Sequence, residues 1–239
     1  TGMTLAKALD GNVVWSTSGY AAWFGQSMTS WDGLDAAKSP RLHGINDTSD
    51  LIGNVNGPAL ITFRWKTELA ESHELSGSHG TLSFSVDGTL NESLSGTRDW
   101  TARTIVLASG SHTLQWRMKR TSFVNPWDGR AWVDTVLVEP VPEPEFADGI
   151  DQPALTWDFE GAGQWFAQSA EGCDGTDVVS APFINFEQSA DFFTSVSGPA
   201  TVSYYAKMSD LSQSRRLYMS VDGANVFGSR CVRMMRVFD

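Results

Sequence analysis

The sequence predicts an all-β protein made of two tandem antiparallel β-sandwiches, the second of which lacks its last strands. Three observations predict this fold. A set of motifs occurs twice, the apolar segments are short and alternate with polar residues, and no stretch has helical periodicity over more than a turn or two. A chain of 239 residues has room for two domains of ordinary size, each with a core of its own.

The repeat has an offset close to 142 residues. Three motifs recur: Trp-Phe-Gly-Gln-Ser at 23–27 as Trp-Phe-Ala-Gln-Ser at 165–169, Asp-Gly-Leu-Asp at 32–35 as Asp-Gly-Thr-Asp at 174–177, and Ser-Val-Asp-Gly at 85–88 and 220–223. The last pair has an offset of only 135, which indicates loop deletions in the second copy. Solenoid repeats run about 20 to 50 residues, so this period indicates a duplicated domain.

The strands of the first copy are predicted from β-branched and aromatic segments bounded by Gly, Pro, Asn or Asp. They are residues 59–66, 81–86, 102–108, 111–119 and 131–138. Asp-Gly at 87–88 and again at 222–223 stands between apolar segments, which predicts a tight hairpin turn with positive φ at the glycine. Gly-Pro at 57–58 and 198–199 precedes the longest predicted strand of each copy.

A proline-rich segment separates the copies. Prolines at 140, 142 and 144 fix φ and remove amide donors, which predicts an extended polyproline spacer. We therefore expect a first sandwich at residues 1–140, a linker at 141–147 and a second sandwich at 148–239.

The second copy has no counterpart of the predicted strands 111–119 and 131–138. A sandwich without two strands exposes core side chains and unpaired backbone. Three explanations stay open at this point: a truncated gene, a continuation beyond residue 239, or completion by a strand from a neighbouring molecule.

The first copy carries a series of framework motifs. They include Leu-Asp at 9–10, Trp15, Gly-Pro-Ala-Leu-Ile-Thr-Phe-Arg-Trp-Lys at 57–66, Trp100, Gly-Ser-His-Thr-Leu-Gln-Trp at 110–116 and Ala-Trp-Val-Asp at 131–134. This series resembles a repeat of large secreted bacterial proteins, related to MAM and concanavalin-like jelly rolls. The resemblance implies two tandem jelly-roll β-sandwiches with an accessory or carbohydrate-binding role beside hydrolases, peptidases or adhesive stalks.

Composition narrows the classes of partner. Charged residues are 19% of the chain, the net charge is −11 and the basic residues form no block, which disfavours nucleic acid and anionic membranes. No apolar segment approaches the ~18 residues of a membrane helix. Few lysines and many Ser, Thr, Gly, Asp and Trp residues indicate an extracellular or cell-surface protein.

Paired aspartates predict a calcium site. Asp32 and Asp35 flank a glycine, the pair returns as Asp174 and Asp177, and Asp134 follows a buried-type Ala-Trp-Val segment. Calcium takes six to eight oxygen ligands, and aspartates clustered on a bend supply them. The alternative is that these carboxylates cap turns by accepting bonds from nearby amides.

Two tryptophans are candidates for sugar binding. Trp31 and Trp127 are not repeated, both lie in polar loops, and Asp32 and Asp128 follow them directly. An indole stacks on the apolar face of a pyranose, while a carboxylate accepts hydrogen bonds from its hydroxyls. The alternative is a tryptophan folded over the end of the sandwich as a lid.

The two cysteines, Cys173 and Cys231, both lie in the second copy and have no counterparts in the first. They predict either a disulfide of that copy or two free buried thiols.

Catalytic patterns are missing from the sequence. Glu68, Glu71 and Glu74 lie in a polar insertion that the second copy shortens, and the histidines have no ligand spacing. We therefore expect no enzyme but an extracellular accessory or adhesive module that binds polysaccharide or a cell-surface glycan. The alternative is a structural spacer, filament or surface-layer subunit completed by a neighbour's strand, and a third is the non-catalytic part of a secreted hydrolase or peptidase. The other expected partners are neighbouring domains of a larger secreted protein, or further copies of this chain through self-association.

Overall fold

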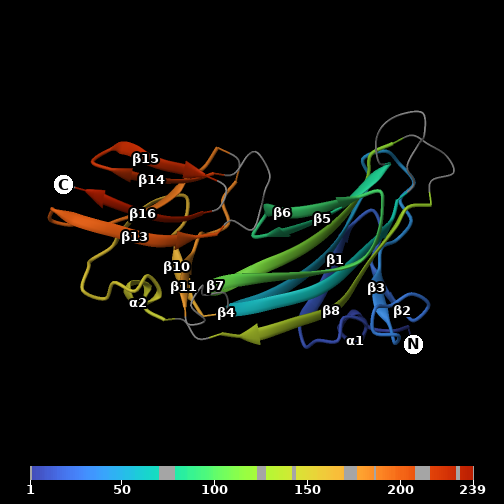
Figure 1. Cartoon of the computed structure of the whole chain (residues 1–239). Helices are drawn as coiled ribbons and strands as arrows, with labels where there is room; N and C mark the ends of the chain where they lie inside the picture. Colours follow the sequence, from blue (N-terminus) through green and yellow to red (C-terminus); the bar gives the residue numbers. More distant parts are fainter. Residues whose placement is uncertain are drawn as a thin grey trace.

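The computed structural model describes residues 2–69, 79–122, 128–141, 144–169, 177–185, 187–207, 216–229 and 232–238. Residues 226–229 and 232–238 are described by their backbone only. The chain is all-β, as predicted, and every strand pair is antiparallel among these residues. Two four-residue helices, α1 (Leu5–Ala8) and α2 (Phe146–Gly149), each precede one copy of the repeat. The two copies occupy adjacent parts of the molecule (Figure 1).

The first copy forms one eight-stranded sheet in the order β2-β3-β8-β4-β7-β5-β6, with β1 paired to β4. Its strands are β1 (Val14–Gly19), β2 (Phe24–Gln26), β3 (Ala36–Lys38), β4 (Thr48–Glu68), β5 (Gly80–Val86), β6 (Thr89–Ser95), β7 (Thr97–Arg120) and β8 (Arg130–Pro140). β4 begins eleven residues earlier than predicted, and β7 joins the two strands predicted at 102–108 and 111–119. These strands therefore continue through Gly57 and Gly110, which were predicted to bound them.

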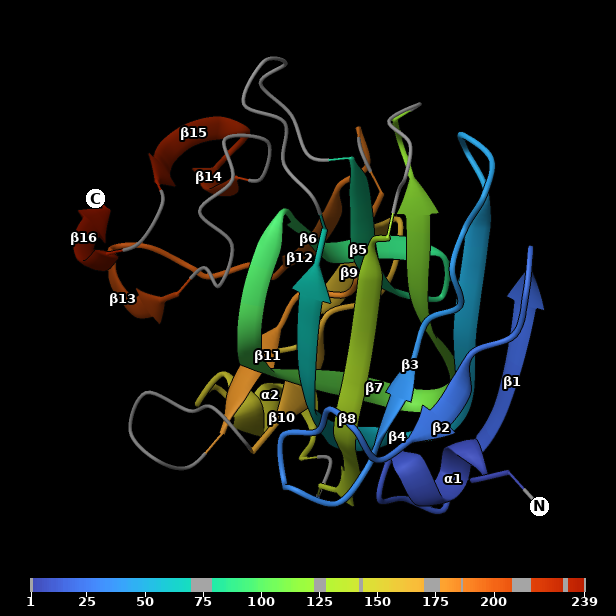
Figure 2. The same ribbon diagram turned by 90° about the vertical axis from the view of Figure 1, so that its right-hand side faces the viewer.

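The pairing of β4 with β7 bends in its middle. It runs from Thr48 opposite Lys119 to Glu68 opposite Thr97, with a register shift at Gly57/Ala59. Gly57 precedes a cis proline, and Gly110 on the facing strand has a φ of 115°, which a side chain rarely allows. The bend folds the sheet over itself to make a β-sandwich, whose curved strands are visible in two views (Figures 1 and 2).

Aromatic rings fill the space between the two halves of this folded sheet. The Phe63 ring, from the half after the bend in β4, lies 4.7 Å from the Phe84 ring and 5.0 Å from the Trp116 ring, measured between centroids. Trp65 packs edge-on to Phe63 at 5.6 Å. All four side chains are buried, so the two tryptophans among them belong to the core.

The second copy forms four separate strand pairs in the described part of the chain: β9–β12, β10–β11, β13–β16 and β14–β15. Its strands are β9 (Asp158–Gly161), β10 (Phe166–Gln168), β11 (Val178–Ser180), β12 (Ala190–Phe193), β13 (Ala200–Ala206), β14 (Leu217–Val221), β15 (Ala224–Ser229) and β16 (Val232–Phe238). In the first copy, β8 and the second half of β7 join the corresponding pairs into one sheet.

Local geometry recurs between the copies. The turn of β14–β15 repeats that of β5–β6: Asp87 and Asp222 have φ of 51° and 49°, and the glycines after them both have φ of 78°. The predicted hairpins are thus confirmed, with the aspartate as well as the glycine at positive φ. Gly19 and Gly161 also correspond, since a Cβ atom on either would lie 2.3 Å from a backbone carbonyl oxygen.

Burial differs sharply between corresponding strands. Leu82, Phe84 and Val86 on β5 are at most 1% exposed, whereas Leu217, Met219 and Val221 on β14 are only half-buried. In the first copy, β5 pairs with Met118, Trp116 and Leu114 of β7, which complete the layer around it. The apolar face of β14 therefore has less cover than its counterpart.

The boundary between the copies differs from the prediction in one detail. α2 begins at Phe146, inside the predicted linker 141–147, while Pro142 and Glu143 lie outside the described residues. Phe183 of the second copy packs against the core of the first. The division into two domains at these residues stays a prediction.

Candidate functional site

One sheet face of the first copy, on the side away from the core, carries a row of large side chains. Phe24 on β2 is opposite Lys38 on β3, Lys38 is opposite Trp132 on β8, and Trp132 is opposite Lys66 on β4. Directly opposite residues in a sheet project from the same face, so the four side chains lie side by side. Their neighbours along the strands, such as Ala37 and Val133, point into the core and are fully buried. Trp132 is itself only 2% exposed, with the Lys38 ammonium over its ring. We call the face with Phe24, Lys38, Trp132, Lys66 and Arg64 the outer face.

Trp31 is fixed on this face by two contacts. Its backbone amide donates a hydrogen bond of 2.6 Å to Oδ2 of Asp134 on β8. Its ring lies over the Arg64 guanidinium, whose Cζ is 4.2 Å from the ring centroid, and Arg64 is itself opposite Asp134 across β4 and β8. The side chain remains 49% exposed. The indole is therefore a half-open aromatic surface, held in place by a cation–π contact on one side.

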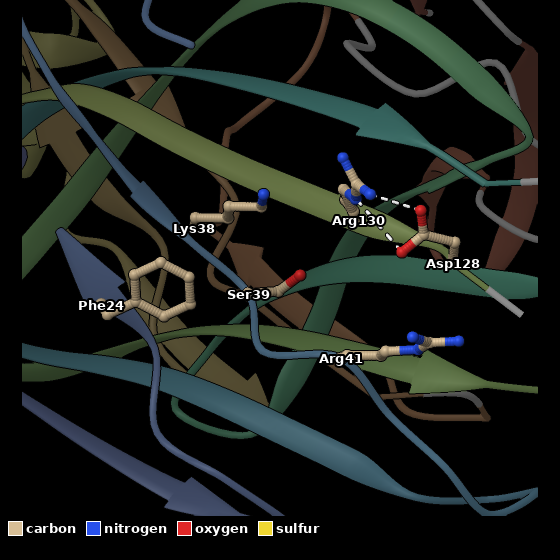
Figure 3. A pocket seen from close by; sticks show the side chains of 6 residues that line it. All are labelled: Phe24, Lys38, Ser39, Arg41, Asp128 and Arg130. Atoms are coloured by element: carbon tan, nitrogen blue, oxygen red, sulfur yellow. Dashed lines mark hydrogen bonds and ion pairs between the residues drawn. The ribbon is translucent and has the colours of Figure 1, made fainter. Parts of the chain in front are cut away.

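A pocket of about 260 Å³ lies on the outer face near the start of β8. Its lining consists of Phe24, Lys38, Ser39, Arg41, Asp128 and Arg130 (Figure 3). Arg130 is ion-paired with Asp128, and the Ser39 hydroxyl accepts a 2.9 Å bond from the Ala131 amide. The Lys38 ammonium lies 5.4 Å above the Trp132 ring. The pocket thus combines an exposed phenyl ring with three cations.

Acidic side chains gather behind the Trp31 loop. Asp134 is fully buried. Burial, followed by repulsion from Asp32 and Asp10, raises the pKa of its carboxyl group. Hydrogen bonds donated by the Trp31 amide and the Thr135 hydroxyl act in the opposite direction. Burial and repulsion from Asp32 and Asp35 likewise raise the pKa of Asp10. Asp35 is 5% exposed, and its Oδ1 atom is buried without a hydrogen-bond partner. The Lys7 ammonium, 3.8 Å from Oδ2 of Asp35, offsets only part of the negative charge of this cluster.

The predicted calcium ligands of the first copy lie in this cluster. Asp32 also caps a turn, as the alternative prediction states. Its Oδ1 accepts a 2.8 Å hydrogen bond from the Leu34 amide. Oxygen donors of this kind suit calcium, but no group of three or more acidic, His or Cys side chains in the described residues is already arranged to hold a metal ion. In the second copy, Asp177 is described and Asp174 lies outside the described residues. The calcium prediction therefore stays open.

The predicted sugar-binding residues divide between two places. Trp31 and Asp32 lie at the Asp134 end of the outer face, and Asp128 lies in the pocket, paired with Arg130. Trp127, Cys173 and Cys231 are outside the described residues. Phe24 and the cations of the outer face were not among the predicted site residues. Phe24 belongs to a motif that occurs in both copies, and its side chain is 46% exposed.

Side chains suited to catalysis are engaged elsewhere. His112 bonds Asp87 at 2.7 Å beside the β5–β6 turn, and the His43 ring stacks on Tyr20 at 5.7 Å. Glu68 lies 3.9 Å from Lys66, while Glu71 and Glu74 are outside the described residues. No helix in the described part of the chain is long and apolar enough to cross a membrane.

Comparisons with known proteins find similarity only at a low level. No protein family and no curated protein matches the sequence. A cleaved adhesin domain of Lys-gingipain from Porphyromonas gingivalis is 12% identical with a TM-score of 0.39, over 55% of this chain and 95% of that one. TmCBM61, solved in complex with β-1,4-galactotriose, is 14% identical with a TM-score of 0.37, over 52% of this chain and 86% of that one.

The secreted serine protease VesC from Vibrio cholerae is 13% identical with a TM-score of 0.37, and the match covers 44% of this chain and 21% of the protease. All three TM-scores are 0.39 or lower, so no statement about function rests on these similarities. The predicted relation to MAM domains stays a prediction.

Proposed function

We propose that this protein is a non-catalytic, extracellular module that binds polysaccharide or a cell-surface glycan on its outer face. The observation that carries the proposal is the Trp31 ring, which is 49% exposed and yet fixed by Arg64 and Asp134. A fixed aromatic ring stacks on a sugar without losing much conformational freedom on binding. Charged side chains of the same face supply hydrogen bonds to sugar hydroxyls.

The test compares two aromatic residues of equal exposure. Trp31→Ala should weaken binding to soluble polysaccharides at least tenfold, about 1.4 kcal/mol, because it removes the stacking surface. Phe193→Ala on β12 is the matched control, since Phe193 is also 49% exposed but lies in the second copy. Affinity is measured by calorimetry against neutral and acidic polymers. Equal affinities of wild type and Trp31→Ala, or binding of no polymer, would refute the proposal.

We propose calcium as a structural ion of the acidic cluster behind Trp31. The buried, unpaired Oδ1 of Asp35 and the raised pKa of Asp134 support this, because a divalent cation relieves both costs. When bound, the ion supplies positive charge that holds the Trp31 loop against β8. Asp32, Asp35 and Asp134 are the residues that would hold it.

A second candidate function is a structural subunit completed by a neighbour's strand. The half-buried face of β14 favours it, since the matching residues of β5 are fully buried in the first copy, where β7 pairs beside β5 in the same sheet. Such a subunit should associate as its concentration rises, whereas a glycan-binding module that needs no strand from a neighbour should stay monomeric. The effect of substituting Leu217 separates the two candidates.

A further inference from the structure

The pocket on the outer face is positively charged in an acidic protein. The chain has 17 Lys and Arg residues against 28 Asp and Glu residues, a net charge of −11. The pocket reverses this balance, with Lys38, Arg41 and Arg130 against the single carboxylate of Asp128. An anionic ligand therefore meets local attraction here, although the whole protein repels it.

Neither Lys38 nor Arg130 is fully neutralised by the protein. Burial lowers the pKa of Lys38, and repulsion from Arg130 lowers it further, although the carboxylates of Asp128 and Glu68 act in the opposite direction. Arg130 has a partner in Asp128, but their side chains are 41% and 57% exposed. An ion pair with this exposure is weak, so the guanidinium can also bind a second anion.

The shape of the pocket suits one charged sugar residue. Its volume of about 260 Å³ lies just below the lower end of the range of pockets for whole small-molecule ligands. Figure 3 shows the Phe24 ring on one side of the pocket and the charged groups of Lys38, Arg41 and Arg130 beyond it. A sugar ring stacked on Phe24 would place a substituent among these three cations.

We propose that this pocket binds the anionic group of an acidic polysaccharide, either a uronate carboxylate or a sulfate ester. The inference rests on the proposed function and names the substrate class of the same face. Guanidinium groups bind both kinds of oxyanion with paired, charge-assisted hydrogen bonds, and the Lys38 ammonium adds a third cationic contact. Phe24 and Trp31 then contact successive parts of one polymer chain.

The test uses the full chain and two matched pairs of polymers: polygalacturonate with its methyl ester, and a sulfated galactan with the unsulfated polymer. One charged polymer or both should bind at least tenfold more tightly than the uncharged partner, and added salt should reduce this advantage. The pair that shows the preference identifies the anionic group. Lys38→Gln and Arg41→Gln should each remove most of the preference while both variants remain folded.

Lys207→Gln, an exposed position on the second copy, is the control for the same loss of charge and should leave the preference intact. Equal affinity for charged and uncharged polymers, or an equal effect of Lys207→Gln, would overturn the pocket assignment. If Trp31→Ala still weakens neutral binding in that case, the proposed function stands and only the acidic substrate class fails. If no polymer binds at all, the proposed function fails as well.

Discussion

Leu82→Ala should lower the free energy of unfolding by about 3 kcal/mol, whereas Leu217→Ala should lower it by about 1 kcal/mol or less. The two leucines occupy the same position of the repeat, on β5 and β14, so the chemical change is identical. Leu82 is fully buried opposite Met118 of β7. Leu217 is only half-buried, and its truncation leaves no closed cavity.

The difference is measured by denaturant unfolding of wild type and both variants at several protein concentrations. Val86→Ala and Val221→Ala repeat the comparison at another inward position of the same two strands, with a smaller expected gap. Equal losses at Leu82 and Leu217 would contradict the difference in cover between the copies. A loss at Leu217 that grows with protein concentration would instead favour the structural subunit completed by a neighbouring molecule.

Calcium at a hundredfold excess over its dissociation constant should raise the free energy of unfolding of the wild type by about 2.7 kcal/mol, and Asp134→Asn should abolish most of this gain. Asn retains an oxygen that accepts the Trp31 amide bond but loses the charge that attracts the ion. In chelator, Asp134→Asn should be at least as stable as the wild type, because it removes a buried carboxylate from a negative cluster.

The pH dependence in chelator gives an independent check on the same residue. Since the folded protein raises the pKa of Asp134 above its ordinary value of 3.8, the stabilisation from its proton is complete below that value. It is lost as the pH rises through the higher folded pKa, and Asp134→Asn should reduce this loss. Asp158→Asn, at an exposed position on β9, is the control. A thermal midpoint that calcium and chelator leave unchanged would refute the calcium site.

Local signals in the sequence predicted local structure well. Asp-Gly at 87–88 and 222–223 predicted both hairpin turns, because these residues adopt positive φ at little cost in conformational free energy. The strand predictions were too short where glycine interrupted the pattern. At Gly57 and Gly110 the backbone bends while the pairing of β4 with β7 continues, which depends on contacts between residues far apart in the chain.

The candidate site was only partly predictable. Trp31 stood out because it is unrepeated in a polar loop, and Asp134 stood out because a carboxylate follows a buried segment. Phe24, Lys38 and Arg130 come from β2, β3 and β8, and only the pairing register brings them to one pocket. These residues have no characteristic spacing in the sequence, so no sequence motif identifies them as one site.

The most direct test of the glycan-binding account is a titration of isotope-labelled protein with a soluble polysaccharide, followed by NMR. Glycan binding on the outer face should give saturable shifts of the Trp31 indole signal and of the amides of β3 and the first half of β8, with little change on β13 and β14. Shifts confined to the second copy, or no saturable shift with any polymer of the panel, would contradict it.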